Sequence, residues 1–141
     1  MRIIGVLMLV ASSFAPAAPC GGDLRGAVIA ESSNYLVAFR TQPPRIAVGK
    51  HFSVEFETCA KGDAPASTGV AVDAFMPEHG HGMNYRAVVK PAAGAKPADA
   101  PTIARYRADG LMFHMPGRWD FYFDVRSASG TERATRSIVL E

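Results

Sequence analysis

Two short segments of the chain concentrate side chains that can bind a metal ion. The first runs from Met76 to Asn84 with the sequence MPEHGHGMN, and the second runs from Met112 to Gly117 with the sequence MFHMPG. Beyond residue 17, every methionine and every histidine except His51 lies in one of them. Soft thioethers favour Cu(I), and imidazole binds copper in either oxidation state. The pattern therefore predicts a copper site, Cu(I) or Cu(II), built from both segments.

The candidate metal ligands are imidazole and thioether side chains from both segments: His79, His81, Met83, His114 and Met115. Gly80 and Gly82 flank His81, and glycine relieves the backbone restrictions that would otherwise keep neighbouring side chains apart. The first segment can therefore curl its ligands toward one point.

Each of these residues also has a purely structural interpretation. Met76 continues the apolar face of Val70, Val72 and Ala74, which favours a core position over a ligand. Met fills irregular gaps in cores, so one of the methionines in the second segment is expected to pack inside. His79 and His81 could serve to cap a tight loop, and His51 lies on a polar face where solvation explains it.

The elements that position these segments are expected to be strands. From Ile46 to Thr58 apolar residues alternate with polar ones, and Trp119 to Val125 does the same, as half-buried strands do. Shorter strand patterns cover Val28–Glu31, Tyr35–Thr41, Val70–Met76, Tyr85–Val89, Ile103–His114 (broken near Gly110) and Ala134–Leu140. Seven to eight strands with turn residues between them predict an all-β fold, an immunoglobulin-like or cupredoxin-like β-sandwich.

In such a sandwich the two metal-binding segments should meet. The first connects Val70–Met76 to Tyr85–Val89, and the second connects Ile103–His114 to Trp119–Val125. Alternate connections gather at one end of a sandwich, so we expect His81 and His114 to lie within reach of a shared ligand. The stretch Pro91–Pro101, rich in Ala and Pro, is expected to be an exposed loop.

The start of the chain is typical of an export signal. Met1-Arg2 is positive, Ile3 to Val10 is apolar, and Ala15-Pro16-Ala17 offers a small-x-small cleavage site. The apolar run is shorter than the roughly 20 residues that span a bilayer. We expect residues 1–17 to be a cleaved signal peptide, with an uncleaved anchor as the alternative, and residues 18–141 to form one periplasmic or secreted domain without a membrane span.

The charge balance excludes some partners. Loss of Arg2 with the signal lowers the formal net charge of +2 by one. Nucleic acid and anionic membranes both require a concentrated basic face, whereas the Lys and Arg residues here are scattered. We therefore expect neither as a partner.

Cys20 and Cys59 are the only cysteines in the chain. An even number of cysteines in an exported protein favours a disulfide bond. The alternative is a pair of free thiols that bind metal. Since Cys59 falls on the polar face of its strand, a disulfide requires the N-terminal segment to cross that face or the strand to end before it.

Nothing in the sequence predicts an enzyme. It contains no nucleophile elbow and no nucleotide-binding loop, and a catalytic zinc site would not be expected to include methionine. A blue-copper carrier needs a Cys ligand close to His and Met, whereas Cys59 is far from both segments.

The two segments also carry a family resemblance. Met76-Pro77-Glu78-His79-Gly80-His81-Gly82-Met83, followed by Phe113-His114-Met115-Pro116-Gly117-Arg118-Trp119, resembles the YtkA-like domain family, which is similar to the periplasmic part of FixH-like proteins. The resemblance spans residues 46–140 and implies an immunoglobulin-like sandwich outside the cytoplasm. FixH-like proteins are associated with copper supply to oxidases, but this chain lacks their retained membrane helix.

Together these observations predict a copper-binding carrier or accessory protein with a His/Met loop site. Its partner would be a copper-receiving protein or an oxidase assembly factor. The alternative is a metal-free interaction module that docks a partner through the two segments.

Overall fold

The computed structural model describes residues 20–22, 24–93 and 102–141. The expected signal peptide, residues 1–17, and most of the expected loop at 91–101 lie outside these ranges. The described residues form nine strands: β1 (Val28–Glu31), β2 (Tyr35–Gln42), β3 (His51–Ala60), β4 (Gly69–Met76), β5 (His81–Gly82), β6 (Val88–Pro91), β7 (Ile103–Met112), β8 (Gly117–Ser127) and β9 (Gly130–Leu140). No helix occurs among them, which confirms the predicted all-β class.

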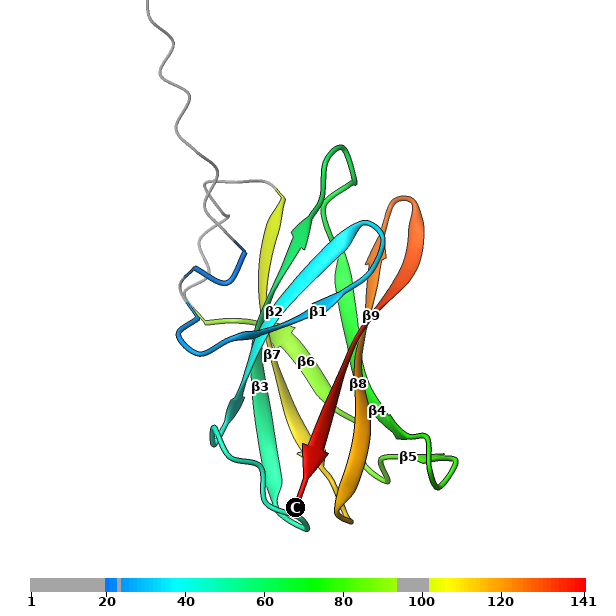
Figure 1. The fold of residues 1–141 in the computed structure, drawn as a ribbon. Helices are drawn as coiled ribbons and strands as arrows, with labels where there is room; N and C mark the ends of the chain where they lie inside the picture. The colour runs from blue at the N-terminus through cyan, green and yellow to red at the C-terminus, as the bar shows by residue number, and fades with distance from the viewer. Residues whose placement is uncertain (1–19, 23, 94–101) are drawn as a thin grey trace, which may run out of the picture.

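The strands form one antiparallel sheet in the order β5-β4-β8-β9-β1-β2-β3-β7-β6. The sheet curls so that its two halves face each other like the layers of a sandwich (Figure 1). Among the described strands, backbone pairing links the halves only through β1, which pairs with β2 along its length but meets β9 at a single position, Glu31 opposite Thr135.

Aromatic side chains fill the space between the halves. The ring of Phe39 on β2 lies 5.4 Å from that of Phe121 and 5.0 Å from that of Phe123, both on β8. Along β8 the odd-numbered residues from Trp119 to Val125 are fully buried, as their alternation predicts. Burial of such side chains contributes about 1.5–3 kcal/mol each. Met76 is also fully buried, which confirms its core position.

Three strand predictions need correction. The predicted strand at Ile46–Thr58 instead begins at His51 and ends at Ala60, because a turn precedes it: Gly49 has a φ of 73°, and the amide of Lys50 donates to the carbonyl of Ala47. The predicted strand at Tyr85–Val89 is replaced by β6, Val88–Pro91.

The third correction concerns Gly110, where a break was predicted. Strand β7 continues through this position, but its pairing register with β3 shifts between Phe52 and Val54. Gly110 has a φ of 85°, so glycine absorbs the local distortion inside an unbroken strand.

The N-terminal segment crosses the polar face of β3. Cys20 is disulfide-bonded to Cys59, as predicted. The amide of Gly21 donates a 2.8 Å hydrogen bond to Oε2 of Glu57, and Oε1 of the same carboxylate lies 2.8 Å from Nε of Arg105. Glu57 is only 2% exposed. The carboxylate of Glu57 can be buried because Arg105 and the amide of Gly21 compensate for its lost hydration.

Within the residues that the structure describes, no helix has the length and apolar character needed to cross a membrane.

Candidate metal site

The first of the two segments predicted to bind metal, Met76–Asn84, forms a tight hairpin between β4 and β5. After Met76 the chain turns through Pro77–Gly80, and the amides of His79 and Gly80 both donate to the carbonyl of Met76. Gly80 adopts a φ of 67°, a conformation that glycine tolerates without steric cost. His81 then pairs opposite Met76. The two-residue strand β5 was not predicted, because it lies inside the expected loop.

The second segment connects β7 to β8 next to this hairpin. Phe113 is fully buried and stacks on Trp119, with ring centroids 4.7 Å apart. The indole Nε1 of Trp119 donates a 3.1 Å hydrogen bond to the carbonyl of Met115. This bond and the packing of Phe113 fix the connection that carries His114.

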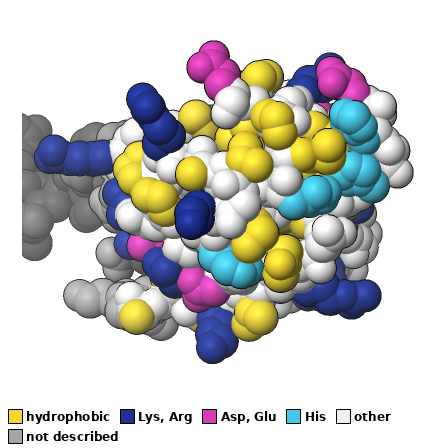
Figure 2. All heavy atoms as spheres, turned by 90° about the horizontal axis from the view of Figure 1, so that it is seen from below, with side chains coloured by type: hydrophobic (Ala, Val, Ile, Leu, Met, Phe, Trp, Pro, Cys, Tyr) yellow, Lys and Arg dark blue, Asp and Glu magenta, His cyan; other side chains and the backbone are white. Residues whose placement is uncertain are grey.

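Three imidazole rings therefore gather at one end of the molecule. The ring centroid of His81 lies 5.0 Å from that of His114 and 5.9 Å from that of His79. The expectation that the two segments meet is confirmed. Figure 2 views this end and shows histidine side chains at the surface next to hydrophobic ones.

Trp119 lies beneath the histidine cluster. Its ring centroid is 5.4 Å from His114 and 5.9 Å from His81, both in edge-to-face orientations. Sequence reasoning placed Trp119 only in a strand and in the family motif. Its contact with both rings depends on the curl of the sheet, which the alternation pattern does not encode.

The hydrogen bonds of the two central histidines differ. Nδ1 of His81 lies 3.2 Å from the carbonyl oxygen of Gly82, so it donates when it carries the proton. That tautomer leaves Nε2 with a free lone pair. Nδ1 of His114 is buried and has no hydrogen-bond partner. A buried polar atom without a partner is costly, so this nitrogen is the natural place for a ligand.

The candidate methionines lie at the same end, partly inside the protein. Met83 and Met115 are half-buried and pack against the core. The amide of Met83 donates to the carbonyl of Ala74, which holds the chain after β5 against β4. His79 is exposed on the turn, whereas His81 and His114 are half-buried.

Two findings limit the site. Among the described residues, no group of three or more His, Cys, Asp or Glu side chains is arranged to hold a metal ion. His51 is exposed, pairs opposite Met112, and makes an edge contact with Tyr85 at 5.0 Å between centroids. The structure thus presents a close pair, His81 and His114, with His79 next to His81.

The fold and the site together define an all-β protein with a histidine cluster at one end of a curled sheet. Comparison with protein-family models finds no match, and neither does comparison with curated proteins. Among solved structures, the chain is similar to a DUF4426 family protein from Pseudomonas aeruginosa PAO1. The identity is 13%, the TM-score is 0.47, and the match covers 84% of this chain and 98% of the other. The resemblance to the YtkA-like family stays a prediction.

Proposed function

We propose that this chain is a non-enzymatic copper-binding carrier or accessory protein that acts in the periplasm or outside the cell. His81 and His114 form the centre of its site, and His79, Met83 and Met115 complete the ligand set. The observation that carries the proposal is the 5.0 Å separation of the two central rings beside the unpartnered Nδ1 of His114.

The spacing of the rings fits a shared metal ion. A metal–imidazole bond of about 2.0–2.1 Å places two rings on one ion about 4.5–6.4 Å apart between centroids, depending on the bond angle. The separations of 5.0 Å for His81–His114 and 5.9 Å for His79–His81 fall within that range. The unpartnered nitrogen of His114 supplies an independent indication, because a ligand there would satisfy it.

The chemistry of the donors favours copper among the metals that imidazole binds. Thioethers are weak ligands for zinc but good ones for Cu(I). Met83 and Met115 are half-buried at the same end, and we assign their sulfurs to the ligand set on that placement. Bound copper would be held by imidazoles in either oxidation state and by thioethers in the reduced one.

Partial exposure suits a carrier. His79 is exposed, and a Cβ added at the neighbouring Gly80 would meet no atom within 4 Å, so the turn is open on this side. A site at one end of the molecule, with one exposed ligand, allows direct transfer to a receiving protein. The motif resemblance makes a copper-receiving protein or an oxidase assembly factor the natural partner.

One finding favours a second candidate function. The part of the chain that the structure describes contains no group of three or more His, Cys, Asp or Glu side chains arranged to hold a metal ion, and hydrophobic side chains lie next to the histidines (Figure 2). A metal-free module would use the same end to dock a partner.

Metal loading separates the two functions. The exported chain is incubated with Cu(I) or Cu(II), desalted, and analysed for copper, with about one ion per chain expected. The double variant His81→Ala/His114→Ala is expected to lose it, and His51→Ala serves as the matched control. A folded double variant that retains copper places the site elsewhere. If the wild-type chain binds no copper at micromolar concentrations, the metal-free interaction module becomes the proposed function.

A further inference from the structure

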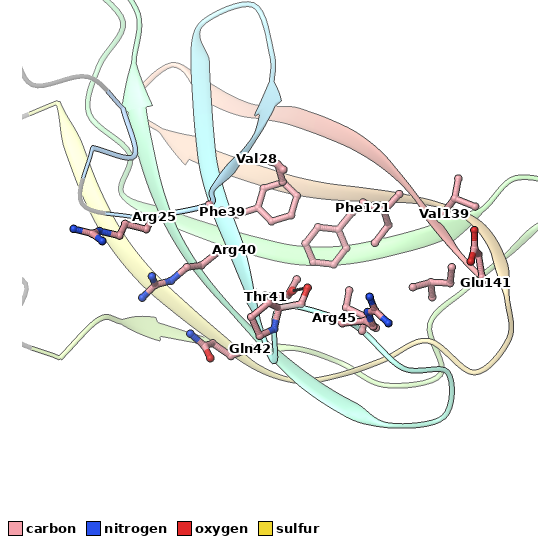
Figure 3. Close-up of a pocket in the computed structure, with 15 residues that line it drawn as sticks. Arg25, Val28, Phe39, Arg40, Thr41, Gln42, Arg45, Phe121, Val139 and Glu141 are labelled. Carbon is pink, nitrogen blue, oxygen red and sulfur yellow. Dashed lines mark hydrogen bonds between the residues drawn. The ribbon is translucent and has the colours of Figure 1, made fainter.

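A second feature, independent of the histidine cluster, is a groove between the two halves of the sheet. Strands β1 and β9 diverge after their single pairing position, Glu31 opposite Thr135. The groove between them has a volume of about 860 Å³. It is lined by residues of β2, β8 and β9, by the segment after β2, and by the start of β1 with the segment before it. Figure 3 shows the rings of Phe39 and Phe121 in its middle, with Arg25 and Arg40 at one end and Val139 and Glu141 at the other.

One wall of the groove is an open strand edge. The β8–β9 hairpin closes with Ser127 opposite Gly130, so from Gly130 onward the even-numbered residues of β9 direct their backbone groups to β8. The odd-numbered residues direct theirs to the other side, as the pairing of Thr135 with β1 shows. Ser137 and Val139 therefore direct N–H and C=O groups to the side of β9 on which the groove lies, and Val139 itself lines the groove. No strand in the described part of the chain pairs with them there.

The opposite wall is open in the same way. Strand β1 begins at Val28, opposite Phe39, so β2 beyond that residue lacks a neighbour on this side. The chain before β1 does not continue alongside β2, because Gly26 turns it away with a φ of 74°. The unpaired ends of β2 and β9 therefore lie on either side of a gap between the two halves of the sheet.

The groove combines apolar and positive character. Phe39 and Phe121 are buried in its floor, and Ile46, Ile138 and Leu140 pack partly against the core. Of the charged residues that line the groove, Arg40 is paired with Glu55, which lies outside it. Glu141 is the acidic residue of the lining. Arg25 and Arg45 are exposed and form no ion pair with any described residue.

We propose that this groove binds an extended acidic segment of a partner protein, which adds to β9 as a further strand. Backbone groups of the segment would pair with Ser137 and Val139, as in other cases of strand addition to an open edge. In an extended chain alternate side chains point to opposite faces. Apolar side chains of the segment would face Phe39 and Phe121, and carboxylates would face Arg25 and Arg45.

A fluorescein-labelled peptide of alternating Glu and Val, about seven residues long, is a suitable probe. Fluorescence polarisation measures its binding to the full chain. The substitution Val139→Pro removes one backbone donor that faces the groove, at an edge where proline is tolerated, whereas Val139→Ala keeps the donor. We expect Val139→Pro to weaken binding about fivefold or more and Val139→Ala to change it little. The double variant Arg25→Glu/Arg45→Glu is expected to weaken it by a similar factor.

Two further peptides keep the test decisive if a variant unfolds. A peptide with Lys in place of Glu, and one with Pro at alternate positions, should both bind the wild-type chain about tenfold more weakly or not at all. Equal binding of the Pro-containing peptide would overturn strand addition. Failure of the Glu/Val peptide to bind would also overturn the proposal. If dodecanoate binds the wild-type chain and the Val139→Pro variant equally well, the groove binds amphiphiles instead of a strand.

Discussion

The imidazole rings of His81 and His114 lie 5.0 Å apart, although one belongs to the β4–β5 hairpin and the other to the connection between β7 and β8. Trp119 contacts both rings from below. This relationship exists only because the sheet curls and brings the two connections to one end. The proposed copper site and two of the predictions below depend on it.

Acid is expected to weaken Cu(II) binding more than Cu(I) binding. Imidazole binds metal only when it is neutral, so protonation competes with the metal, whereas thioethers do not titrate. Competition titrations from about pH 7.5 to about pH 5.5 should show a steep loss of Cu(II) affinity. If both affinities fall equally, Met83 and Met115 take no part in Cu(I) binding.

Loss of the disulfide bond should lower stability without changing the site. Cys20 and Cys59 are separated by 39 residues and fasten the N-terminal segment over Glu57. The double variant Cys20→Ser/Cys59→Ser is expected to lose roughly 2–4 kcal/mol of unfolding free energy in urea denaturation. Reductant should have little effect on that variant. An unchanged wild-type midpoint on reduction would contradict the structural role.

Glu132 should make stability depend on pH. Its carboxylate accepts hydrogen bonds from Nδ2 of Asn34, from the Asn34 amide and from Oγ of Ser32. The bond from the Asn34 side chain is the main reason that the pKa of Glu132 is lowered. A lowered folded-state pKa contributes stability above the unfolded-state pKa, and that contribution is lost as pH falls through the folded-state value.

Urea unfolding of the variant Glu132→Gln tests this. It should be less stable than the wild type at neutral pH, and the difference should close in acid. The matched control is Asp63→Asn, which removes a carboxylate at an exposed position, and the trend of Glu132→Gln is compared with it. A gap between Glu132→Gln and wild type that stays constant with pH contradicts the assignment.

Gly117 should tolerate no side chain. Its φ of 118° disfavours other residues, and a Cβ there would lie 2.7 Å from Cε of the buried Met76. We expect Gly117→Ala to cost roughly 1–3 kcal/mol in thermal or urea unfolding. Gly130→Ala, where φ is likewise 118° but nothing lies within 4 Å, should cost less. Equal costs would show that contact with Met76 is unimportant.

The sequence predicts most of the fold because the alternation on β8 matches its burial, and the apolar residues of the alternating stretch in β3 are buried. It also predicts that His81 and His114 meet, since that follows from strand order. It fails where long-range contacts override the local pattern. Ile46 and Val48 continue the alternation of β3, yet the strand begins only at His51, because the chain turns at Gly49, whose amide donates to the distant carbonyl of Phe113.

Burial of polar residues was equally invisible in the sequence. The alternation predicts that Glu57 faces solvent, but the N-terminal segment covers it and Arg105 contacts its carboxylate. Likewise, the groove beside β9 arises from the divergence of two strands that are far apart in the chain. No local pattern encodes that divergence.

The central claim is that copper binds between His81 and His114, and the fluorescence of Trp119 tests it most directly. Trp119 is the only tryptophan, and its ring lies 5.4 Å from His114 and 5.9 Å from His81. Because a paramagnetic ion quenches an indole in near contact, titration with Cu(II) should quench the emission and saturate at about one ion per chain. His51→Ala should quench like the wild type, and His81→Ala/His114→Ala should not. Equal quenching of that folded double variant, or no quenching of the wild type, would contradict the account.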